Sequence, residues 1–430
     1  MNAHEDRRDF LKAAALAGAG FWVAGGVEAA SSQAANDRLN FACIGVGGKG
    51  RSDTADAASH GNVVAICDVD DGTLAKSAAL YPKARRFNDF RRMFDTLGKS
   101  IDAVTVSTAD HTHAVASALA MRLGKHCHTQ KPLTHSIHEA RRLAEIARER
   151  KVATQMGNQG TASAALRRAA AIIRAGTLGA VREVHVWTDR PGKYWEQGLA
   201  RPAQAAVPKA LHWDLWLGPV AARPYGVGYH PFRWRGFWDF GTGALGDMGC
   251  HNLNMAFMGL DLRDPIAVEA ETSGHNKESY PRWSIVRYTF AERNSRPRLT
   301  LTWYDGGRRP AAELAPGQDL GSNGSLVIGA KGKLLFSRGY KLLGDVEEPR
   351  VKVTESPGHF AEFVRAIRGG PAAMSNFPDY AGPLTETVLL GNLAIWAGKR
   401  IEWDARKLRA TNAAEVAPLI QPTYRKGYSL

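Results

Sequence analysis

The sequence predicts an α/β protein whose first half is a doubly wound parallel sheet. Two observations support this. From about residue 38 to residue 158, short apolar runs alternate with helical stretches, which is typical of β-α-β units. After about residue 160 the strand candidates become longer and alternate between apolar and polar residues, which indicates a second, differently built domain.

The elements of the first half can be followed in order. "LNFACIG" is a short apolar strand, "RSDTADAASH" continues as a helix, and "NVVAICD" is a second strand. "IDAVTVS" has the continuous apolar character of a strand buried on both faces. The helix "HAVASALAMRLG", the strand "KHCHTQ", the helix "HSIHEARRLAEIARERK" and the strand "VATQMG" complete the series.

The second half is rich in strands and ends in two helices. We expect strands in "VREVHVWT", "RWSIVRYTFA", "RLTLTWY" and "SLVIGAKGKLLF". Near the end, "HFAEFVRAIRGG" and "LTETVLLGNLAIWAGKR" are predicted to be amphipathic helices.

Composition excludes several classes of protein. At 430 residues, 44% apolar and 23% charged, the chain has an ordinary globular composition and is long enough for two or three domains. After residue 30 it has no apolar run of membrane-spanning length. The formal charge of +14 is spread without a basic helical stripe, so a solvated basic surface is favoured over nucleic-acid binding. Four cysteines, at 43, 67, 127 and 250, lack metal-ligand spacing, and whether any of them pair is left open.

The first 35 residues resemble a twin-arginine signal peptide and linker. Arg7-Arg8-Asp9-Phe10-Leu11-Lys12 is followed by a Gly/Ala-rich apolar segment and by small residues suited to cleavage. The alternative is an N-terminal helix of the mature fold, but each of its glycines would cost roughly 1 kcal/mol there. We therefore expect export to the periplasm, or otherwise out of the cytoplasm, through the twin-arginine machinery, which carries proteins already folded.

A glycine-rich turn follows the first strand. Gly45-x-Gly47-x-x-Gly50 offers a tight turn, close approach of backbone to a pyrophosphate, and close packing of helix on strand. The anion would lie at the helix N-terminus. Asp68 ends the second strand, where an acidic residue binds the ribose hydroxyls and repels a 2′-phosphate. The sequence therefore predicts NAD, in preference to NADP, as the cofactor.

Further motifs point to one family. "CDVD", "STADHTHA", the Lys-Pro pair in "TQKPLT" and the segment "GDMGCHNLNMAFMGL" together resemble the Gfo/Idh/MocA oxidoreductases. The resemblance implies an NAD-binding Rossmann domain over residues 36–158. It also implies a substrate-binding domain over residues 159–430, built on an open, mostly antiparallel sheet. It further implies a sugar or glycoside substrate, and we expect an assembly of identical chains.

The resemblance also assigns residues. Lys131, Asp247 and His251 would be catalytic: the cation stabilises a developing alkoxide, the histidine takes the alcohol proton, and Asp247 orients the imidazole or binds a hydroxyl. An alternative is that Asp247 and His251 only cap a helix. The motif is usually Glu-Lys-Pro, so Gln130 removes a carboxylate beside the lysine, and Asn254 replaces a further aspartate of the family. The predicted cofactor-binding residues are Gly45, Gly47, Gly48, Gly50, Asp68, Thr108, His111, His113, Gln130 and Lys131. His111 and His113 are expected beneath the cofactor, and no metal site is predicted.

An aromatic segment, "HWDLWLGPVAARPYGVGYHPFRWRGFWDFG", precedes Asp247. Aromatic faces with nearby Arg and His suit a sugar ring, which predicts substrate contacts from Tyr229, His230, Arg233 and Trp234. A tryptophan-rich core or subunit interface explains the segment equally well.

Three functions compete. The first is an NAD-dependent oxidoreductase acting on a secondary alcohol of a sugar, and the second is a redox-neutral NAD-dependent glycosidase. In the glycosidase a ring hydroxyl is oxidised, elimination expels the glycosidic group, water adds, and the hydride returns. The third, a non-catalytic sugar-binding protein, is disfavoured because Lys131, Asp247 and His251 are all present. Because an exported enzyme has no steady supply of soluble NAD, we expect the cofactor to stay bound through a redox-neutral cycle.

Overall fold

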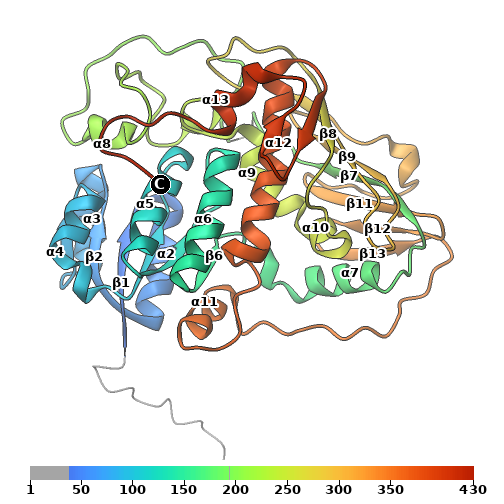
Figure 1. Ribbon diagram of the computed structural model, residues 1–430, viewed down its shortest axis with the longest axis horizontal. Helices are drawn as coiled ribbons and strands as arrows, with labels where there is room; N and C mark the ends of the chain where they lie inside the picture. Colours follow the sequence, from blue (N-terminus) through green and yellow to red (C-terminus); the bar gives the residue numbers. More distant parts are fainter. Residues whose placement is uncertain (1–37, 193) are drawn as a thin grey trace, which may run out of the picture. The chain divides into compact units, whose positions relative to one another are not determined.

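The computed structural model describes residues 38–192 and 194–430. The predicted signal peptide therefore lies outside the described residues. Within them, the chain forms two sheets with helices packed around them (Figure 1). No helix of the described part is both long and apolar enough to cross a membrane.

The first sheet is fully parallel and has the strand order β3-β2-β1-β4-β5-β6. Its strands are β1 (Leu39–Ile44), β2 (Gly61–Cys67), β3 (Arg85–Phe87), β4 (Ala103–Val106), β5 (His126–Thr129) and β6 (Thr154–Met156). The helices between them are α2 (Gly48–His60), α3 (Asp71–Leu80), α4 (Phe90–Leu97), α5 (Asp110–Arg122) and α6 (Ile137–Arg150). This order, with its reversal between β1 and β4, is that of a Rossmann fold and confirms the prediction.

The start of α6 illustrates how local sequence places an element. The Ser136 hydroxyl accepts the Glu139 amide at 3.3 Å, and the Glu139 carboxylate accepts the Ser136 amide at 2.8 Å. This reciprocal pair satisfies N–H groups that a helix start leaves unbonded. It fixes the helix that follows the lysine–proline segment.

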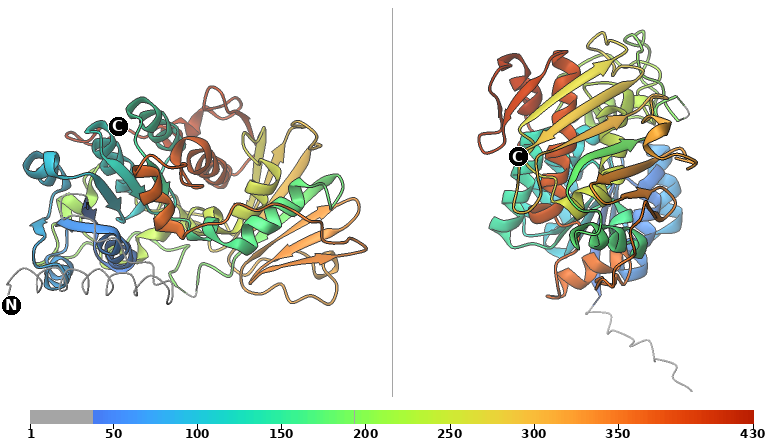
Figure 2. Two further views of the ribbon diagram at one scale, coloured as in Figure 1. Left: turned by 90° about the horizontal axis from the view of Figure 1, so that it is seen from below. Right: turned by 90° about the vertical axis from the view of Figure 1, so that its right-hand side faces the viewer.

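The second sheet has nine strands in the order β13-β12-β11-β7-β10-β9-β8-β14-β15 (Figure 2). Its strands are β7 (Val181–Trp187), β8 (Ala267–Thr272), β9 (Ser284–Phe290), β10 (Leu299–Tyr304), β11 (Gly324–Gly329), β12 (Lys333–Phe336), β13 (Tyr340–Leu343), β14 (Ile401–Asp404) and β15 (Arg409–Ala410). Only the β7–β10 pair is parallel, so the sheet is mostly antiparallel, as expected.

The helices of the second half are α7 (Ala164–Arg174), α8 (Trp213–Leu217), α9 (Gly243–Asn252), α10 (Asn254–Leu260), α11 (His359–Ile367), α12 (Gly382–Ala397) and α13 (Ala417–Ile420). Of these, α7, α10 and α12 pack on the second sheet, whereas α11 packs on α2 and β6 of the first half. Along β9, buried and half-buried residues alternate, as expected for a sheet covered more fully on one face.

Two predictions about the second half are wrong in detail. "SLVIGAKGKLLF" forms the two paired strands β11 and β12, because the chain turns at Ala330–Gly332. The helix α12 is not amphipathic: every residue from Thr387 to Ile395 is buried. It packs against α6 and α9 as well as against β8 and β9, so no side of its middle faces water.

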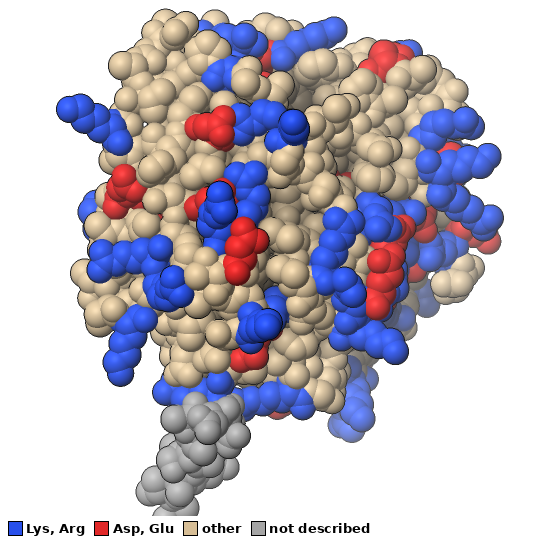
Figure 3. Space-filling model, turned by 60° about the vertical axis from the view of Figure 1, so that its left-hand side comes forward, with Lys and Arg blue, Asp and Glu red and all other residues tan. Residues whose placement is uncertain are grey.

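The cysteines and the surface charge complete the description. All four cysteines are buried and unpaired. On the face drawn in Figure 3, Lys and Arg side chains are spread among Asp and Glu and form no single basic stripe.

Candidate active site

The glycine-rich turn has the geometry that Gly45 and Gly50 predict, whereas a Cβ at Gly47 would lie 2.8 Å from the Thr73 methyl group. Gly45 has a φ of +76°, and a Cβ there would lie 2.6 Å from the Ser107 carbonyl oxygen. A Cβ at Gly50 would lie 1.9 Å from the Gly45 carbonyl oxygen, so helix and turn are in direct contact. Gly48 has a φ of +48° and open space around its missing Cβ. The helix α2 that starts there has no side-chain cap, which leaves its first N–H groups for an anion.

Asp68 is placed at the end of β2, beside this turn. Its carboxylate accepts the Val46 amide at 2.9 Å and the Asp70 amide at 3.0 Å. Burial raises the pKa of Asp68, whereas these two backbone hydrogen bonds act in the opposite direction. Together with the open space at Gly48, a carboxylate at this position fits a dinucleotide whose ribose hydroxyls approach the strand end.

The strand register gathers the predicted residues at one edge of the parallel sheet. Ile44 pairs with Val106, and Val106 pairs with Thr129. The turn after β1, the loop after β4 and the lysine–proline segment after β5 therefore begin at the same level. This is the carboxyl edge, where ligands bind in such sheets.

Thr108, His111 and His113 lie after β4, but their polar atoms are engaged within the protein. The Thr108 hydroxyl accepts a hydrogen bond from the Thr112 hydroxyl at 2.6 Å. The two ring nitrogens of His111 contact the backbone carbonyls of Phe240 and Trp216, at 3.1 and 2.8 Å.

His113 bridges in the same way, between the carbonyl oxygens of Pro132 and Thr108 at 2.9 and 3.1 Å. Burial lowers the pKa of His111 to about 3 and also lowers the pKa of His113. Both rings thus connect loops around the site, and their predicted contact with the cofactor stays a prediction.

Gln130 has a carboxylate partner that the sequence did not reveal. Its side-chain amide donates to Asp53 of α2 at 2.9 Å. The buried Asp53 carboxylate also accepts the Ser107 hydroxyl at 2.7 Å and pairs with Lys49 at 2.5 Å. Gln130 therefore fastens the lysine-bearing segment to the helix of the glycine-rich turn.

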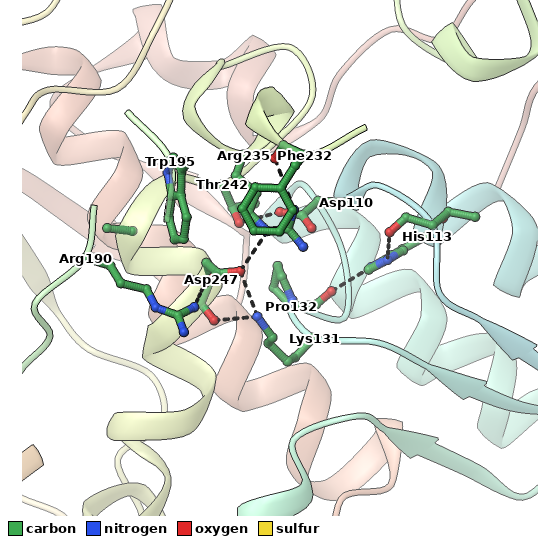
Figure 4. Close-up of polar contacts among 12 residues, drawn as sticks. Asp110, His113, Lys131, Pro132, Arg190, Trp195, Phe232, Arg235, Thr242 and Asp247 are labelled. Atoms are coloured by element: carbon green, nitrogen blue, oxygen red, sulfur yellow. Dashed lines mark hydrogen bonds and ion pairs between the residues drawn. The ribbon is translucent and has the colours of Figure 1, made fainter. Parts of the chain in front are cut away.

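Lys131 and Asp247 meet across the two sheets (Figure 4). The Lys131 ammonium group donates to the Asp247 carboxylate and to its backbone carbonyl, each at 2.8 Å. Asp247 lies on α9 and only 6% of its side chain is exposed. Burial opposes its charged form, but the nearby cations, Lys131 first, hold the pKa of Asp247 well below its usual range. The carboxylate is thus ionised at neutral pH.

Two arginines that sequence reasoning missed also contact this carboxylate. Arg190 donates to Asp247 at 2.9 Å, and Arg235 lies 3.3 Å from it. Arg190 follows β7 in the sequence, and Arg235 belongs to a short 3-10 helix, Arg233–Gly236. In the sequence, Arg235 is marked only by its aromatic neighbours, and the same feature marks Arg233, which was predicted instead.

His251 lies one turn after Asp247 on α9, as its spacing predicts. No hydrogen bond joins its ring to Asp247 or to any other residue of the described part. Asp247 therefore does not orient the imidazole through a hydrogen bond, because its oxygens are taken by the three cations. Burial, followed by the charge of Lys131, lowers the pKa of His251 to about 3. The half-buried ring is thus neutral at physiological pH, and the lowered pKa makes it a weaker base than an ordinary histidine.

The four predicted substrate residues are placed differently from one another. Tyr229 is buried, and its hydroxyl donates to Glu278 at 3.1 Å, so it belongs to an aromatic core with Trp216 and Phe240. His230 is half-buried with its ring 6.4 Å from that of Trp216. Arg233 is exposed and contacts no catalytic candidate.

Trp234 is the member of the four that lies next to the site. The Arg235 guanidinium lies 4.2 Å from the centre of the Trp234 ring. Most of the aromatic segment therefore forms a packed core, as the second interpretation of its sequence predicts. The segment reaches Asp247 through Arg235.

Comparisons with solved structures show the same architecture. The chain matches GenD2 from gentamicin A biosynthesis, solved with NAD, at 19% identity and a TM-score of 0.59. The match covers 86% of this chain and 97% of that one. It matches the WlbA dehydrogenase from Bordetella pertussis, solved with NADH and UDP-GlcNAcA, at 16% identity and the same TM-score, over 85% and 99% of the two chains. At such identities the likeness shows the fold alone.

Curated relatives match over shorter stretches. A "Glycosyl hydrolase family 109 protein" from Solibacter usitatus is 31% identical over 149 residues, which cover 31% of this chain and 34% of that protein. A "UDP-N-acetylglucosamine 3-dehydrogenase" from Acidithiobacillus ferrooxidans is 30% identical over 115 residues, 27% of this chain and 35% of that protein. The chain thus aligns with about a third of the length of each.

Family models cover nearly all of the described chain. Residues 39–158 match "Oxidoreductase family, NAD-binding Rossmann fold", and residues 163–430 match "Oxidoreductase family, C-terminal alpha/beta domain". The cofactor is therefore NAD, in agreement with the glycine-rich turn and Asp68. The protein belongs to the Gfo/Idh/MocA oxidoreductase family.

Proposed function

We propose that the protein oxidises a secondary alcohol of a sugar or sugar derivative with tightly bound NAD. The observation that carries this proposal is the meeting of Lys131, from the NAD-binding sheet, with Asp247 and the nearby neutral His251 of the second domain. The sugar-related names of the similar dehydrogenases support the substrate class.

The side chains divide the chemistry of alcohol oxidation. The neutral His251 ring accepts the hydroxyl proton, and an N–H of Lys131 hydrogen-bonds the oxygen as negative charge develops there. Asp247 holds the lysine in place. When bound, NAD supplies the hydride acceptor, and the residues described above would hold it at the carboxyl edge of the parallel sheet.

A redox-neutral glycosidase is the second candidate, and the match to the glycosyl hydrolase family 109 protein favours it. In that case the ring alcohol is oxidised, the proton next to the new ketone is lost, and the aglycone leaves. Water then adds and the alcohol is restored. The same three side chains serve the first step of both reactions.

The predicted twin-arginine signal leads to a property that both candidates would share. We propose that the protein is exported through the twin-arginine route with NAD already bound, and that the hydride is returned within each cycle. A dehydrogenase that released NADH outside the cytoplasm would stop after one turnover.

The test uses mature protein purified without added cofactor. Chromatography of the denatured protein should release about one NAD per chain, and a panel of free sugars and glycosides should then give many product molecules per chain without NAD. Released aglycone selects the glycosidase, whereas paired oxidised and reduced sugars select the oxidoreductase. Protein that is purified without bound NAD, and whose turnover rises in proportion to added NAD, would contradict the redox-neutral cycle. Location of the mature chain in cell fractions tests the export step by itself.

A further inference from the structure

The charges around Asp247 do not balance. Lys131 and Arg190 contact its carboxylate at 2.8 and 2.9 Å, and Arg235 lies 3.3 Å away. Three cations thus share one carboxylate among the described residues. One lysine at hydrogen-bond distance is enough to keep an aspartate ionised, so the two guanidinium groups bring positive charge that Asp247 does not neutralise.

A second carboxylate nearby does not supply the missing charge. Asp110 is buried and accepts the Thr242 hydroxyl at 2.7 Å. It makes no ion pair with either arginine within the described chain, and burial raises its pKa, which disfavours its charged form. The excess of positive charge next to the catalytic candidates therefore remains.

Most N–H groups of the two arginines have no partner among the described residues. A guanidinium carries five N–H donors. Arg190 donates one Nη1–H to Asp247, and its buried Nε has no hydrogen-bond partner in the part of the chain that the structure describes. Arg235 donates from Nε to Asp247 and from Nη1 to the Phe232 carbonyl, the latter at 3.1 Å. No hydrogen bond from its Nη2 is found within the described residues. The Arg190 Nε is buried, and a buried donor ordinarily finds an acceptor.

Aromatic side chains hold both guanidinium groups in place. Arg190 lies 4.1 Å from the centre of the Tyr194 ring and 5.7 Å from that of Trp195. Arg235 lies 4.3 Å from the Phe232 ring centre, in addition to its contact with Trp234. Stacked guanidinium groups lose little further freedom when an acceptor arrives, which suits them to bind a ligand.

The exposed fractions show which groups a ligand can reach. The side chains of Arg190 and Arg235 are 25% and 22% exposed, whereas Asp247 is 6% exposed. A molecule entering the site thus meets the arginines from the solvent side, with the carboxylate behind them. Figure 4 shows both arginines directed at Asp247 beside Trp195 and Phe232.

We propose that the sugar substrate carries an oxyanion, either a carboxylate or a phosphate ester, which Arg190 and Arg235 bind together. This inference rests on the proposed function of the same site and narrows its substrate class. Planar guanidinium groups bind such oxyanions through paired, charge-assisted hydrogen bonds. The anion would anchor one end of the sugar and leave a ring hydroxyl for Lys131 and His251.

The experiment compares matched ligands on the NAD-loaded protein at constant ionic strength. Glucose, glucuronate and glucose 6-phosphate form one set, and galactose, galacturonate and galactose 6-phosphate form the other. Tryptophan fluorescence reports binding, and nicotinamide absorbance reports oxidation. We expect an anionic member to bind about ten- to hundredfold more tightly than its neutral partner. The carboxylate and phosphate members then distinguish the two sources of the anion.

Variants connect the preference to the arginines. Arg190→Gln and Arg235→Gln should each remove most of the anion preference while affecting neutral sugars little. Arg190→Lys keeps the charge without the planar fork and should retain only part of it. Arg298→Gln, at an exposed position without an ion pair in the described chain, is the matched control and should bind as the unchanged protein does. Retained NAD confirms folding of each variant.

The outcomes separate this inference from the proposed function. Equal binding of neutral and anionic partners, including no binding by either, overturns the inference. So does equal weakening of both by the arginine variants, which would show a structural role. Oxidation of neutral sugars alone would leave the proposed function in place. Preferential anion binding without any change at the nicotinamide would support the anion site and contradict the oxidoreductase.

Discussion

The lysine ammonium group sets the chemistry at the scale of single residues. An ammonium group has three N–H donors, and Lys131 uses two on the carboxylate and the carbonyl of Asp247. One N–H is left for a substrate oxygen. His251 is neutral and makes no hydrogen bond within the described chain, and in the proposed reaction it is the group that takes the alcohol proton.

The first prediction tests these three side chains. Lys131→Met, Asp247→Asn and His251→Ala should each lower turnover by about 10²–10⁴-fold. The first removes the donor to the developing alkoxide, the second removes the charge that holds this donor in place, and the third removes the proton acceptor. Steady-state rates are compared at equal NAD content, so that loss of cofactor is not mistaken for loss of chemistry. Met248→Leu, a buried swap on the same helix, is the control. A near-native rate for the His251 variant would contradict its role as base.

The second prediction concerns Gln130, where the structure changes what the sequence alone suggests. From the sequence, Gln130→Glu should move the alkaline limb of the pH–rate profile upward, because a carboxylate favours a charged lysine. The structure places the Asp53 carboxylate 2.9 Å from the Gln130 amide. Two carboxylates that close do not both ionise readily, so the single variant should shift the limb only slightly.

The paired variant separates the two effects. In Asp53→Asn/Gln130→Glu the amide and the carboxylate exchange places, and the hydrogen bond is kept. We expect this protein to show the larger upward shift of the alkaline limb. A larger shift in the single variant than in the double one would mean that Asp53 does not control the group at position 130.

At the scale of elements, local pattern predicted the strands and turns of the cofactor half, and the NAD-binding family of that half is confirmed. Glycine spacing, the acidic residue at the end of β2 and the lysine–proline segment are short-range features, and the strand register brings them to one edge. Arg190 and Arg235 were not predictable in this way. Arg190 lies outside any helix or strand and is 57 residues from Asp247, and Arg235 lies in a single 3-10 turn, so no periodic pattern marks either residue.

The third prediction tests the glycine-rich turn. Gly50→Ala should weaken NAD binding strongly, because its Cβ would lie 1.9 Å from the Gly45 carbonyl oxygen and would push α2 away from the turn. Gly98→Ala is the matched control, since a Cβ there meets nothing within 4 Å and its backbone is right-handed helical. The NAD content of the purified proteins is the measurement. Full NAD content in the Gly50 variant would show that the turn tolerates displacement.

The fourth prediction concerns the end of β2. The native protein should bind NAD far more tightly than NADP, and Asp68→Ala should narrow the gap, because the repulsion of a 2′-phosphate is removed. Asp68 also fixes the Val46 amide, so some loss of affinity for both nucleotides is expected. Asp71→Asn, a half-exposed carboxylate nearby, controls for general charge loss. Equal affinity of the native protein for both nucleotides would contradict this role of Asp68.

At the scale of the whole molecule, the two sheets are not independent of each other. The helix α11 belongs to the second half of the sequence, yet its Phe360 and Phe363 pack in the core that contains Phe41 of β1. Figure 1 shows α11 next to the parallel sheet. The predicted domain boundary near residue 158 divides the sequence in chain order, but it does not predict that α11 packs back on the first domain. That packing depends on long-range contacts, which no local sequence pattern encodes.

The packing of α11 on the first domain buries two histidines next to each other. The ring centroids of His128 on β5 and His359 on α11 are 5.9 Å apart. His128 Nε2 and His359 Nδ1 are buried and have no hydrogen-bond partner among residues 38–192 and 194–430. Burial lowers the pKa of His359 to about 3, with His128 adding to the effect, and burial also lowers the pKa of His128. Each must therefore stay neutral for α11 to remain packed.

The last prediction follows from the sign of that shift. Between pH about 6.5, the ordinary value for histidine, and about 3, the unfolded chain binds a proton at position 359 that the folded chain does not. Stability attributable to this group is therefore complete above 6.5 and is lost as the pH falls, by at most about 1.4 kcal/mol per pH unit. His359→Gln keeps a donor for the Met156 carbonyl and removes the imidazole that titrates, so the stability of this variant should fall less steeply with falling pH.

Other groups, such as Asp305, whose pKa burial raises to about 6, act in the opposite direction but equally in both proteins. Urea unfolding of the two proteins across this pH range measures the difference, which should be constant above 6.5 and change steadily below it. Parallel curves throughout would mean that His359 becomes protonated without release of α11.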